Sequence, residues 1–259
     1  MTRSIGAQRG GTGFLNLEEY AGQFELEERY WWFVGRRRIV ASLLQTLSPP
    51  GRDPLRIADV GCGTGGNLGL LDRWGEVTGV DSSPEALRFC SQRGRANVVR
   101  GSADRLPFAE ASLDLVTALD VLEHLQDDRA ALAEFRRVLR PGGHLVLTVP
   151  AYRFIWSEHD EALHHKRRYV LGEVRQKVAG SGLEVRRISY AISAILPVAI
   201  VFRILQGLRP SREDRPKTGY VALPGFANAL LASYLGLEAR WLARASLPAG
   251  LSIVCVARR

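Results

Sequence analysis

Cysteine is scarce in this sequence, and its thiols are scattered. Cys62, Cys90 and Cys255 lie far apart in a chain of 259 residues, and no Cys-x-x-Cys pair occurs. A disulfide scaffold would need a denser and more regular set of cysteines. We therefore expect reduced thiols and a cytoplasmic protein.

Signal-peptide and membrane-spanning patterns are also lacking. The N-terminal sequence MTRSIGAQRGG has no apolar core of the signal-peptide type, so we expect no export. The apolar run at residues 191–202 contains Pro197 and is too short to cross a bilayer. Three interpretations of this run stay open: a buried or dimer-forming helix, the wall of a hydrophobic substrate tunnel, or a peripheral membrane contact.

Acidic residues are outnumbered by basic ones. The chain has 35 Lys and Arg against 27 Asp and Glu, a net charge of +8. This excess suits nucleic acid, an anionic membrane surface or a phosphorylated substrate, but an arginine-rich proteome would produce it equally well. The basic residues fall in short clusters, such as the one at residues 166–168, and form no long tail.

The pattern along the chain predicts one elaborated α/β domain behind a helical cap. Residues 1–13 are Gly-rich and polar, which predicts a disordered N-terminus. Residues 14–54 read as a helical cap, with a helical pattern over 15–47, followed by a breaker-rich linker. Residues 55–259 read as the main domain, with a lid at 151–170 and a helical insertion at 191–250.

Short apolar runs alternate with helical segments in this main domain. A helix is expected to begin near residue 66, and others cover 128–139, 171–179 and 227–245. Such alternation predicts a parallel, doubly wound sheet with helices on both faces. The predicted strands cover residues 55–60, 77–80, 97–100, 113–119, 144–150, 183–190 and 251–259.

A glycine loop follows the first predicted strand, in the sequence IADVGCGTGGN (57–67). Gly61, Gly63 and Gly65 allow a sharp turn and a close approach of backbone to a ligand. Asp81 closes the second strand, where an acid can accept both hydroxyls of a ribose. The loop lacks the GxGxxG spacing of pyrophosphate sites, and the carboxylate of Asp59 favours an ammonium group over phosphates.

These motifs resemble those of class I S-adenosylmethionine-dependent methyltransferases. The resemblance covers about residues 55–150 and is closest to the small-molecule group that includes the quinone-biosynthesis enzymes. It implies a Rossmann-like sheet of seven strands, mostly parallel, with the last strand antiparallel. The matching stretches are DVGCGTG (59–65), GVDSSPEAL (79–87), GSADRLPF (101–108), LDLVTALDVLEHL (113–125) and LRPGGHLVLTVP (139–150).

The resemblance also implies S-adenosylmethionine as cofactor and assigns residues to it. The glycines would pass along its methionine part, Asp81 would take the ribose, and Asp104 would receive the adenine amine. Trp32 would wall the cofactor and Arg36 would pair with its carboxylate. The full predicted set is Trp32, Arg36, Asp59, Gly61, Cys62, Gly63, Gly65, Asn67, Asp81, Ser82, Ala103, Asp104, Arg105, Asp120 and Val121.

Histidines and acids cluster in WSEHDEALHHKRRY (156–169), which leaves the fifth strand and should cover the pocket mouth. In a helix, Asp160 would lie one turn from His164, and Glu161 one turn from His165, as an acid that orients a base does. A metal site is not predicted, because His159 and His164 are five residues apart and HExxH needs four. The candidate catalytic residues are His124, His159, Asp160, His164 and His165.

Simpler interpretations stay open for these histidines. The stretch at 156–169 can be a solvated lid helix, and His124 can be a capping or packing residue. The main functional prediction is methyl transfer to a small-molecule acceptor, at oxygen or else at carbon, with a lipid-like or phosphate-bearing acceptor favoured. The alternatives are methylation of nucleic acid, for which no separate RNA-binding module is seen, and cofactor binding without turnover. Expected partners are the acceptor, with a homodimer or a peripheral membrane contact as further options.

Overall fold

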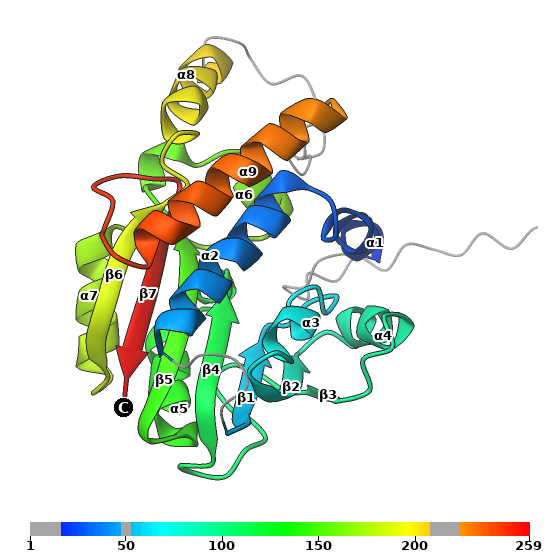
Figure 1. Ribbon diagram of the computed structural model, residues 1–259, viewed down its shortest axis with the longest axis vertical. Coiled ribbons are helices and arrows are strands. Elements are labelled where there is room, and N and C mark those ends of the chain that lie inside the picture. Colours follow the sequence, from blue (N-terminus) through cyan, green and yellow to red (C-terminus); the bar gives the residue numbers. More distant parts are fainter. Residues whose placement is uncertain (1–16, 48–52, 208–222) are drawn as a thin grey trace, which may run out of the picture.

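The computed structural model describes residues 17–47, 53–207 and 223–259 (Figure 1). The disorder predicted for residues 1–13 and most of the linker predicted at 48–54 lie outside these ranges. The described chain folds around one sheet, whose topology decides where a ligand can bind.

The sheet contains seven strands in the order β3-β2-β1-β4-β5-β7-β6. Only β7 runs antiparallel, pairing with β5 on one side and β6 on the other. This arrangement confirms the predicted doubly wound sheet with its antiparallel last strand. The strands are β1 (Leu55–Val60), β2 (Gly75–Asp81), β3 (Val98–Arg100), β4 (Leu113–Leu119), β5 (Leu139–Pro150), β6 (Glu184–Ala191) and β7 (Ser252–Arg258).

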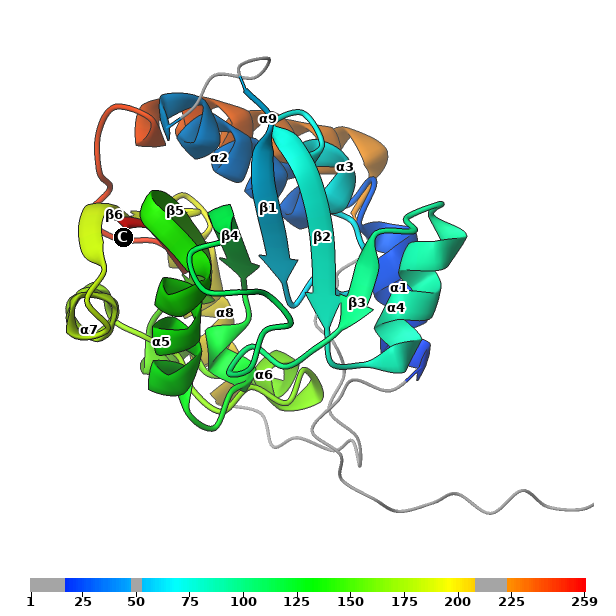
Figure 2. The ribbon, with the colours of Figure 1, turned by 90° about the horizontal axis from the view of Figure 1, so that it is seen from below.

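Helices cover both faces of the sheet, as Figure 2 shows, with α2 and α9 on one face and α5 and α7 on the other. The α-helices are α1 (Leu17–Leu26), α2 (Trp31–Leu47), α3 (Leu68–Leu71), α4 (Pro84–Gln92), α5 (Asp128–Val138), α6 (Glu158–Ala162), α7 (Leu171–Gly180), α8 (Leu196–Gly207) and α9 (Gly225–Leu242). Two short 3₁₀ helices, η1 (Leu122–His124) and η2 (Arg153–Ile155), follow β4 and β5.

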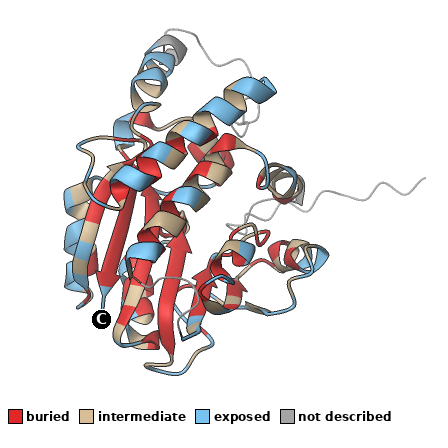
Figure 3. Ribbon diagram, in the orientation of Figure 1, coloured by how far each residue is buried: buried red, intermediate tan, exposed pale blue. Residues whose placement is uncertain are grey.

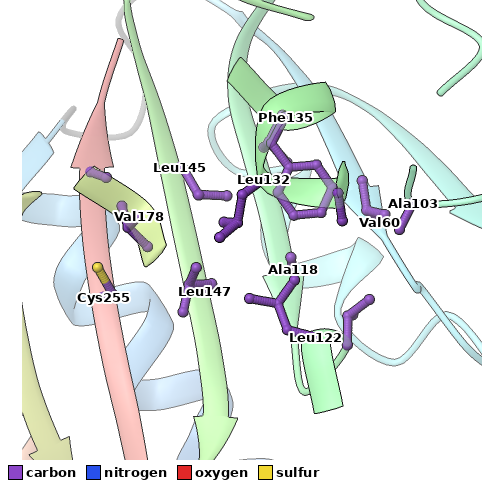
Figure 4. Close-up of a cluster of buried hydrophobic side chains, with 14 of the residues drawn as sticks. Val60, Ala103, Ala118, Leu122, Leu132, Phe135, Leu145, Leu147, Val178 and Cys255 are labelled. Atoms are coloured by element: carbon purple, nitrogen blue, oxygen red, sulfur yellow. The ribbon is translucent and has the colours of Figure 1, made fainter. Parts of the chain in front are cut away.

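The α5 face shows how the pattern of apolar residues builds the core. Asp127 caps the helix by accepting hydrogen bonds from the backbone N–H groups of Arg129 and Ala130, both at 3.0 Å. Leu132 and Phe135 then point from α5 onto β4 and β5, where they are fully buried (Figure 4). Burial of side chains of this size contributes about 1.5–3 kcal/mol each.

The opposite face is formed by helices from the two ends of the chain. α2 and α9 lie side by side across the sheet, and their facing sides are buried (Figures 1 and 3). Gly35 permits the close approach, because a Cβ there would lie 2.1 Å from Cδ1 of Leu235. Glu238 fixes α9 to the end of β6 by accepting from the backbone of Ser193 at 3.0 Å. The second half of the predicted insertion is therefore part of the core.

Several predicted element boundaries differ from the structure. The helical pattern at 15–47 forms two helices, because residues 27–30 separate α1 from α2. The helix expected from residue 66 is the single turn α3, and the lid holds the short helices η2 and α6. Among the residues that the structure describes, none of the helices combines the length and the apolar character that crossing a bilayer requires.

Candidate active site

A cavity of about 740 Å³ opens at the carboxyl ends of the parallel strands. The glycine loop, the end of β2 and the segment after β4 form its walls, while α1, α2, the lid and α8 close over it. The predicted residues that line it are Trp32, Arg36, Gly61, Cys62, Gly63, Asn67, Asp81, Ser82, Ala103, Asp120, Val121, His124, His159 and His165. Ligands of open α/β sheets bind at this edge, so the topology supports the predicted position of the site.

The glycine loop presses against the strand exit of β4. Gly61, Gly63 and Gly65 have φ values of 68°, 55° and 84°, which side chains rarely tolerate. A Cβ on Gly61 would lie 2.5 Å from Cγ2 of Val121. Glycine at position 61 therefore lets the loop backbone pack directly against Val121, and both residues line the cavity.

Asp81 is tied to this loop by its own carboxylate. Its Oδ2 accepts from the backbone N–H of Gly63, and its Oδ1 from that of Ser83, both at 2.9 Å. Burial raises the pKa of Asp81, and these backbone hydrogen bonds offset part of that rise. Each carboxylate oxygen has a second lone pair, so both can still accept a hydrogen bond from a ligand.

Some predicted cofactor residues do not line the cavity. Asp59 is buried behind the loop, where Thr117 Oγ1 donates to its Oδ1 at 2.6 Å. Burial raises the pKa of Asp59 to about 7, against the lowering effect of this hydrogen bond. Gly65 shapes the turn from behind, and Asp104 and Arg105 are exposed outside the cavity. Their roles toward a cofactor remain predictions.

Sequence reasoning missed three lining residues, Tyr20 and Gln23 in α1 and Glu27 directly after it. Glu27 is buried and accepts hydrogen bonds from Thr64 Oγ1 at 2.5 Å and from Arg93 at 2.9 Å. These contacts hold α1 on the glycine loop. The sequence of α1 carries no motif, and its contact with residues about forty positions away gives no local signal.

Arg36 has a partner within the protein. It forms an ion pair with Asp120, where pairing with the cofactor's carboxylate was predicted. Asp120 has a φ of 57° and also accepts from Thr148 Oγ1 at 2.8 Å, so the strand exit of β4 is firmly held. The pair joins α2 to the floor of the cavity.

Three histidines meet in the wall of the cavity. The ring centroid of His165 lies 4.8 Å from that of His124 and 6.4 Å from that of His159. Burial lowers the pKa of His124 to about 3 and that of His159 to about 4, with the neighbouring His165 adding to both shifts. Both imidazoles are therefore neutral at pH 7.

Asp160 orients one of these rings, although a different one from that predicted. Its Oδ1 lies 2.8 Å from Nδ1 of His165, and Arg168 donates to both of its oxygens at 2.7 and 2.9 Å. Burial alone would raise the pKa of Asp160, but these hydrogen bonds outweigh it and hold the pKa well below its usual range. Asp160 is thus a buried carboxylate that fixes His165 from behind.

The predicted pairs Asp160–His164 and Glu161–His165 are wrong because α6 ends early. The backbone N–H of His165 bonds the carbonyl of Asp160 at 2.8 Å, and that of His164 bonds Glu161 at 3.0 Å. These two backbone hydrogen bonds form a Schellman turn. Such a turn needs a residue in the left-handed conformation, and His164 adopts that conformation with a φ of 55°. The turn leaves His164 exposed and swings His165 onto Asp160.

Glu123 is a further residue that sequence reasoning missed. Its carboxylate is fully buried in the cavity wall, and neither oxygen has a hydrogen-bond partner among the described residues. Burial raises its pKa well above the usual value, and the nearby Asp120 adds to the rise. The sequence signal was present in the string DVLEH, where an acid directly precedes the candidate base.

Comparison with known proteins places this site in context. Residues 58–147 match the family described as a methyltransferase domain. The chain is 29% identical over 234 residues to malonyl-[acyl-carrier protein] O-methyltransferase of Methylococcus capsulatus, covering 79% of this chain and 85% of that protein. It is 31% identical to a protein of Mycolicibacterium smegmatis described as an S-adenosylmethionine-dependent methyltransferase, covering 61% of each.

Solved structures agree on the fold. An S-adenosylmethionine-dependent methyltransferase of Thermotoga maritima superposes with a TM-score of 0.55 at 18% identity, covering 93% of this chain and 97% of that one. The chain spans 56% to 61% of the length of three of the curated relatives that it matches. The names of the relatives differ in their methyl acceptors.

Proposed function

Because this chain carries a class I S-adenosylmethionine-dependent methyltransferase domain, we propose that it methylates an oxygen of a small acceptor with an apolar part. The bound cofactor would supply a methyl group already activated by a sulfonium. The protein must then hold the cofactor, align the acceptor, remove its proton and exclude water.

The glycine loop and Asp81 would hold the cofactor. Val121 already fills the space that a Cβ on Gly61 would take, so only glycine lets the loop backbone lie against Val121 at the wall of the cavity. The two oxygens of Asp81 face the same cavity with unused acceptor capacity, which suits the two hydroxyls of a ribose. Trp32 and Ala103, which also line the cavity, would flank the rest of the ligand.

The observation that carries the proposal is that neutral, half-buried histidines line the same cavity as the glycine loop. One of His159, His165 or His124 would take the hydroxyl proton of the acceptor as its oxygen bonds to the methyl carbon. The carbon–sulfur bond would break at the same time, and its electron pair would stay on sulfur. Asp160 and Arg168 would keep the ring of His165 in place during this step.

Helix α8 suggests the class of acceptor. Ile195, just before α8, and Ala199 and Phe202 within it contribute an apolar stretch to the cavity wall, and Arg203 adds a positive charge there. On the same helix, Val198 and Ile204 are exposed to solvent. An apolar helix that both lines the cavity and faces outward suits a lipid-like acceptor presented at a membrane surface.

Two measurements test this proposal. Calorimetry with S-adenosylhomocysteine tests the cofactor site, and a chain that does not bind this compound would refute the proposal at its base. Methyl incorporation from labelled cofactor is then compared between long-chain phenols or lipids and total RNA. We expect labelled lipid-like products, and label in RNA with a steep salt dependence would favour the nucleic-acid alternative.

A further inference from the structure

We propose that Glu123, His124 and His165 bind a divalent transition-metal ion at the acceptor end of the cavity. One donor atom from each residue lies within 4.8 Å of the donor atoms of the other two. Metal bonds of about 2.1 Å would separate the donors by roughly 3.4 Å, so modest side-chain rotations close the site. The sequence did not predict this site, because its ligands come from two segments about forty residues apart.

The backbone brings these two segments together. Glu123 and His124 lie in η1, directly after β4, and His165 follows the turn that ends α6. The backbone N–H of Lys166 donates to the carbonyl of Glu123 at 2.8 Å, which fixes one segment against the other. The three side chains line the same cavity, so a ligand there is open to an acceptor.

The charges around the site favour a cation next to Glu123. Asp120 has Arg36 as its partner, and Asp160 has Arg168. Glu123 is fully buried, yet neither of its oxygens has a hydrogen-bond partner within the described ranges. A buried carboxylate without a partner costs several kcal/mol unless a proton or a metal compensates it.

Asp160 supplies the carboxylate that often hydrogen-bonds the second ring nitrogen of a metal-bound histidine. It holds Nδ1 of His165 at 2.8 Å, so Nε2 is the ring nitrogen that remains for a metal. A carboxylate behind a ligating histidine fixes the ring and increases its basicity. In the sequence reasoning this acid was the partner of a catalytic base, and the same contact serves a metal ligand.

The donor set indicates the kind of metal. Two imidazoles and one carboxylate suit Zn²⁺, Fe²⁺ or a neighbouring first-row ion, whereas Mg²⁺ and Ca²⁺ prefer an all-oxygen set. Three protein ligands leave coordination positions open. An acceptor hydroxyl bound at one of them would have a lower pKa and a fixed orientation toward the cofactor end of the cavity. This role rests on the proposed function, whereas the metal binding itself does not.

The test is a Co²⁺ titration of the full-length chain after removal of metals with a chelator. Visible absorption of bound Co²⁺ reports its ligand set, and Zn²⁺ should displace it. We expect stoichiometric binding to the wild-type chain and a loss of more than about 10-fold in affinity for Glu123→Gln and His165→Asn. Asp160→Asn should lose about 10- to 100-fold, the effect typical of an outer partner.

His164→Asn is the matched control, because it removes an exposed histidine one residue from the site and asparagine tolerates a left-handed backbone. It should bind Co²⁺ as the wild type does. Absence of stoichiometric Co²⁺ or Zn²⁺ binding to the wild type, or unchanged affinity in Glu123→Gln, would overturn the metal site.

A parallel titration with S-adenosylhomocysteine separates this proposal from the function. Variants that keep this affinity are folded, so their loss of Co²⁺ is specific. A wild-type chain that binds the nucleoside but not the metal refutes the metal site alone. A chain that binds Co²⁺ but not the nucleoside refutes the proposed function and leaves the metal site standing.

Discussion

Replacement of Asp81 by asparagine should weaken binding of S-adenosylhomocysteine by about 10- to 100-fold. The carboxylate already accepts one backbone N–H on each oxygen, from Gly63 and from Ser83. An amide has one oxygen, so its NH₂ group would face one of these two donors without a partner. The change therefore disturbs the glycine loop in addition to removing a charge.

The magnitude follows from the hydrogen bonds involved. A hydrogen bond to a charged group contributes about 1.5–3 kcal/mol, and every 1.4 kcal/mol corresponds to a tenfold change in affinity. Loss of one such bond to a ribose hydroxyl gives the lower end of the range. Displacement of the loop at Gly63 adds to it.

Isothermal calorimetry of the full-length chain measures this effect, with Glu76→Gln as the control. Glu76 lies on the same strand, is exposed and does not line the cavity, so its variant removes the same charge without the contact. Equal affinities of Asp81→Asn and the wild type, within about twofold, would refute the assignment of the cofactor site. Asp104→Asn tests whether the exposed loop that carries Asp104 closes over the ligand. A large loss of affinity for S-adenosylhomocysteine in this variant would mean that the loop closes.

Three further predictions concern stability. Asp128→Asn should cost about 3 kcal/mol at pH 7, because Asp128 is buried and accepts from Lys177 at 2.7 Å. Burial raises the pKa of Asp128, but its hydrogen bonds lower the pKa by more, so the folded-state pKa lies below the usual value. The stability that Asp128 contributes is therefore present above about pH 4 and is lost as the pH falls through the folded-state pKa. Urea unfolding at pH 7 and at pH 3 measures this loss. Gly35→Ala should destabilise by about 1–3 kcal/mol, and Leu235→Ala in the same chain should recover part of the loss; additive effects would contradict the close contact. His164→Gly should stabilise by about 1 kcal/mol through relief of its left-handed backbone, seen as a higher melting temperature; a lower one would contradict the strain.

The side of the cavity formed by the glycine loop was predictable because its signals are local. The glycines and Asp81 sit at strand ends, and the alternation of apolar runs with helical segments predicts a parallel sheet. Ends of parallel strands share one edge of the sheet, so residues far apart in sequence could be placed together.

The side of the cavity formed by the histidines depends on contacts that no local sequence pattern predicts. Helical spacing predicts that Asp160 contacts His164, but the left-handed turn at His164 brings His165 into contact with Asp160 instead. Glu123 was not predictable, because what distinguishes it is a buried carboxylate without a hydrogen-bond partner among the described residues. Only tertiary packing decides this. The contact of α1 with the glycine loop likewise arises from the fold as a whole.

The pairing of α2 with α9 has a consequence for synthesis on the ribosome. Ser42 of α2 donates to the carbonyl of Ala239 in α9 across 197 positions of the chain. At translation rates of about 5–20 residues per second, roughly 10–40 s pass between the synthesis of α2 and that of α9, which covers the apolar side of α2. During that interval the buried sides of α2 and of the sheet lack the contacts that α9 later makes. Strand β7 follows α9 in the chain and pairs with both β5 and β6, so these two elements join the fold late.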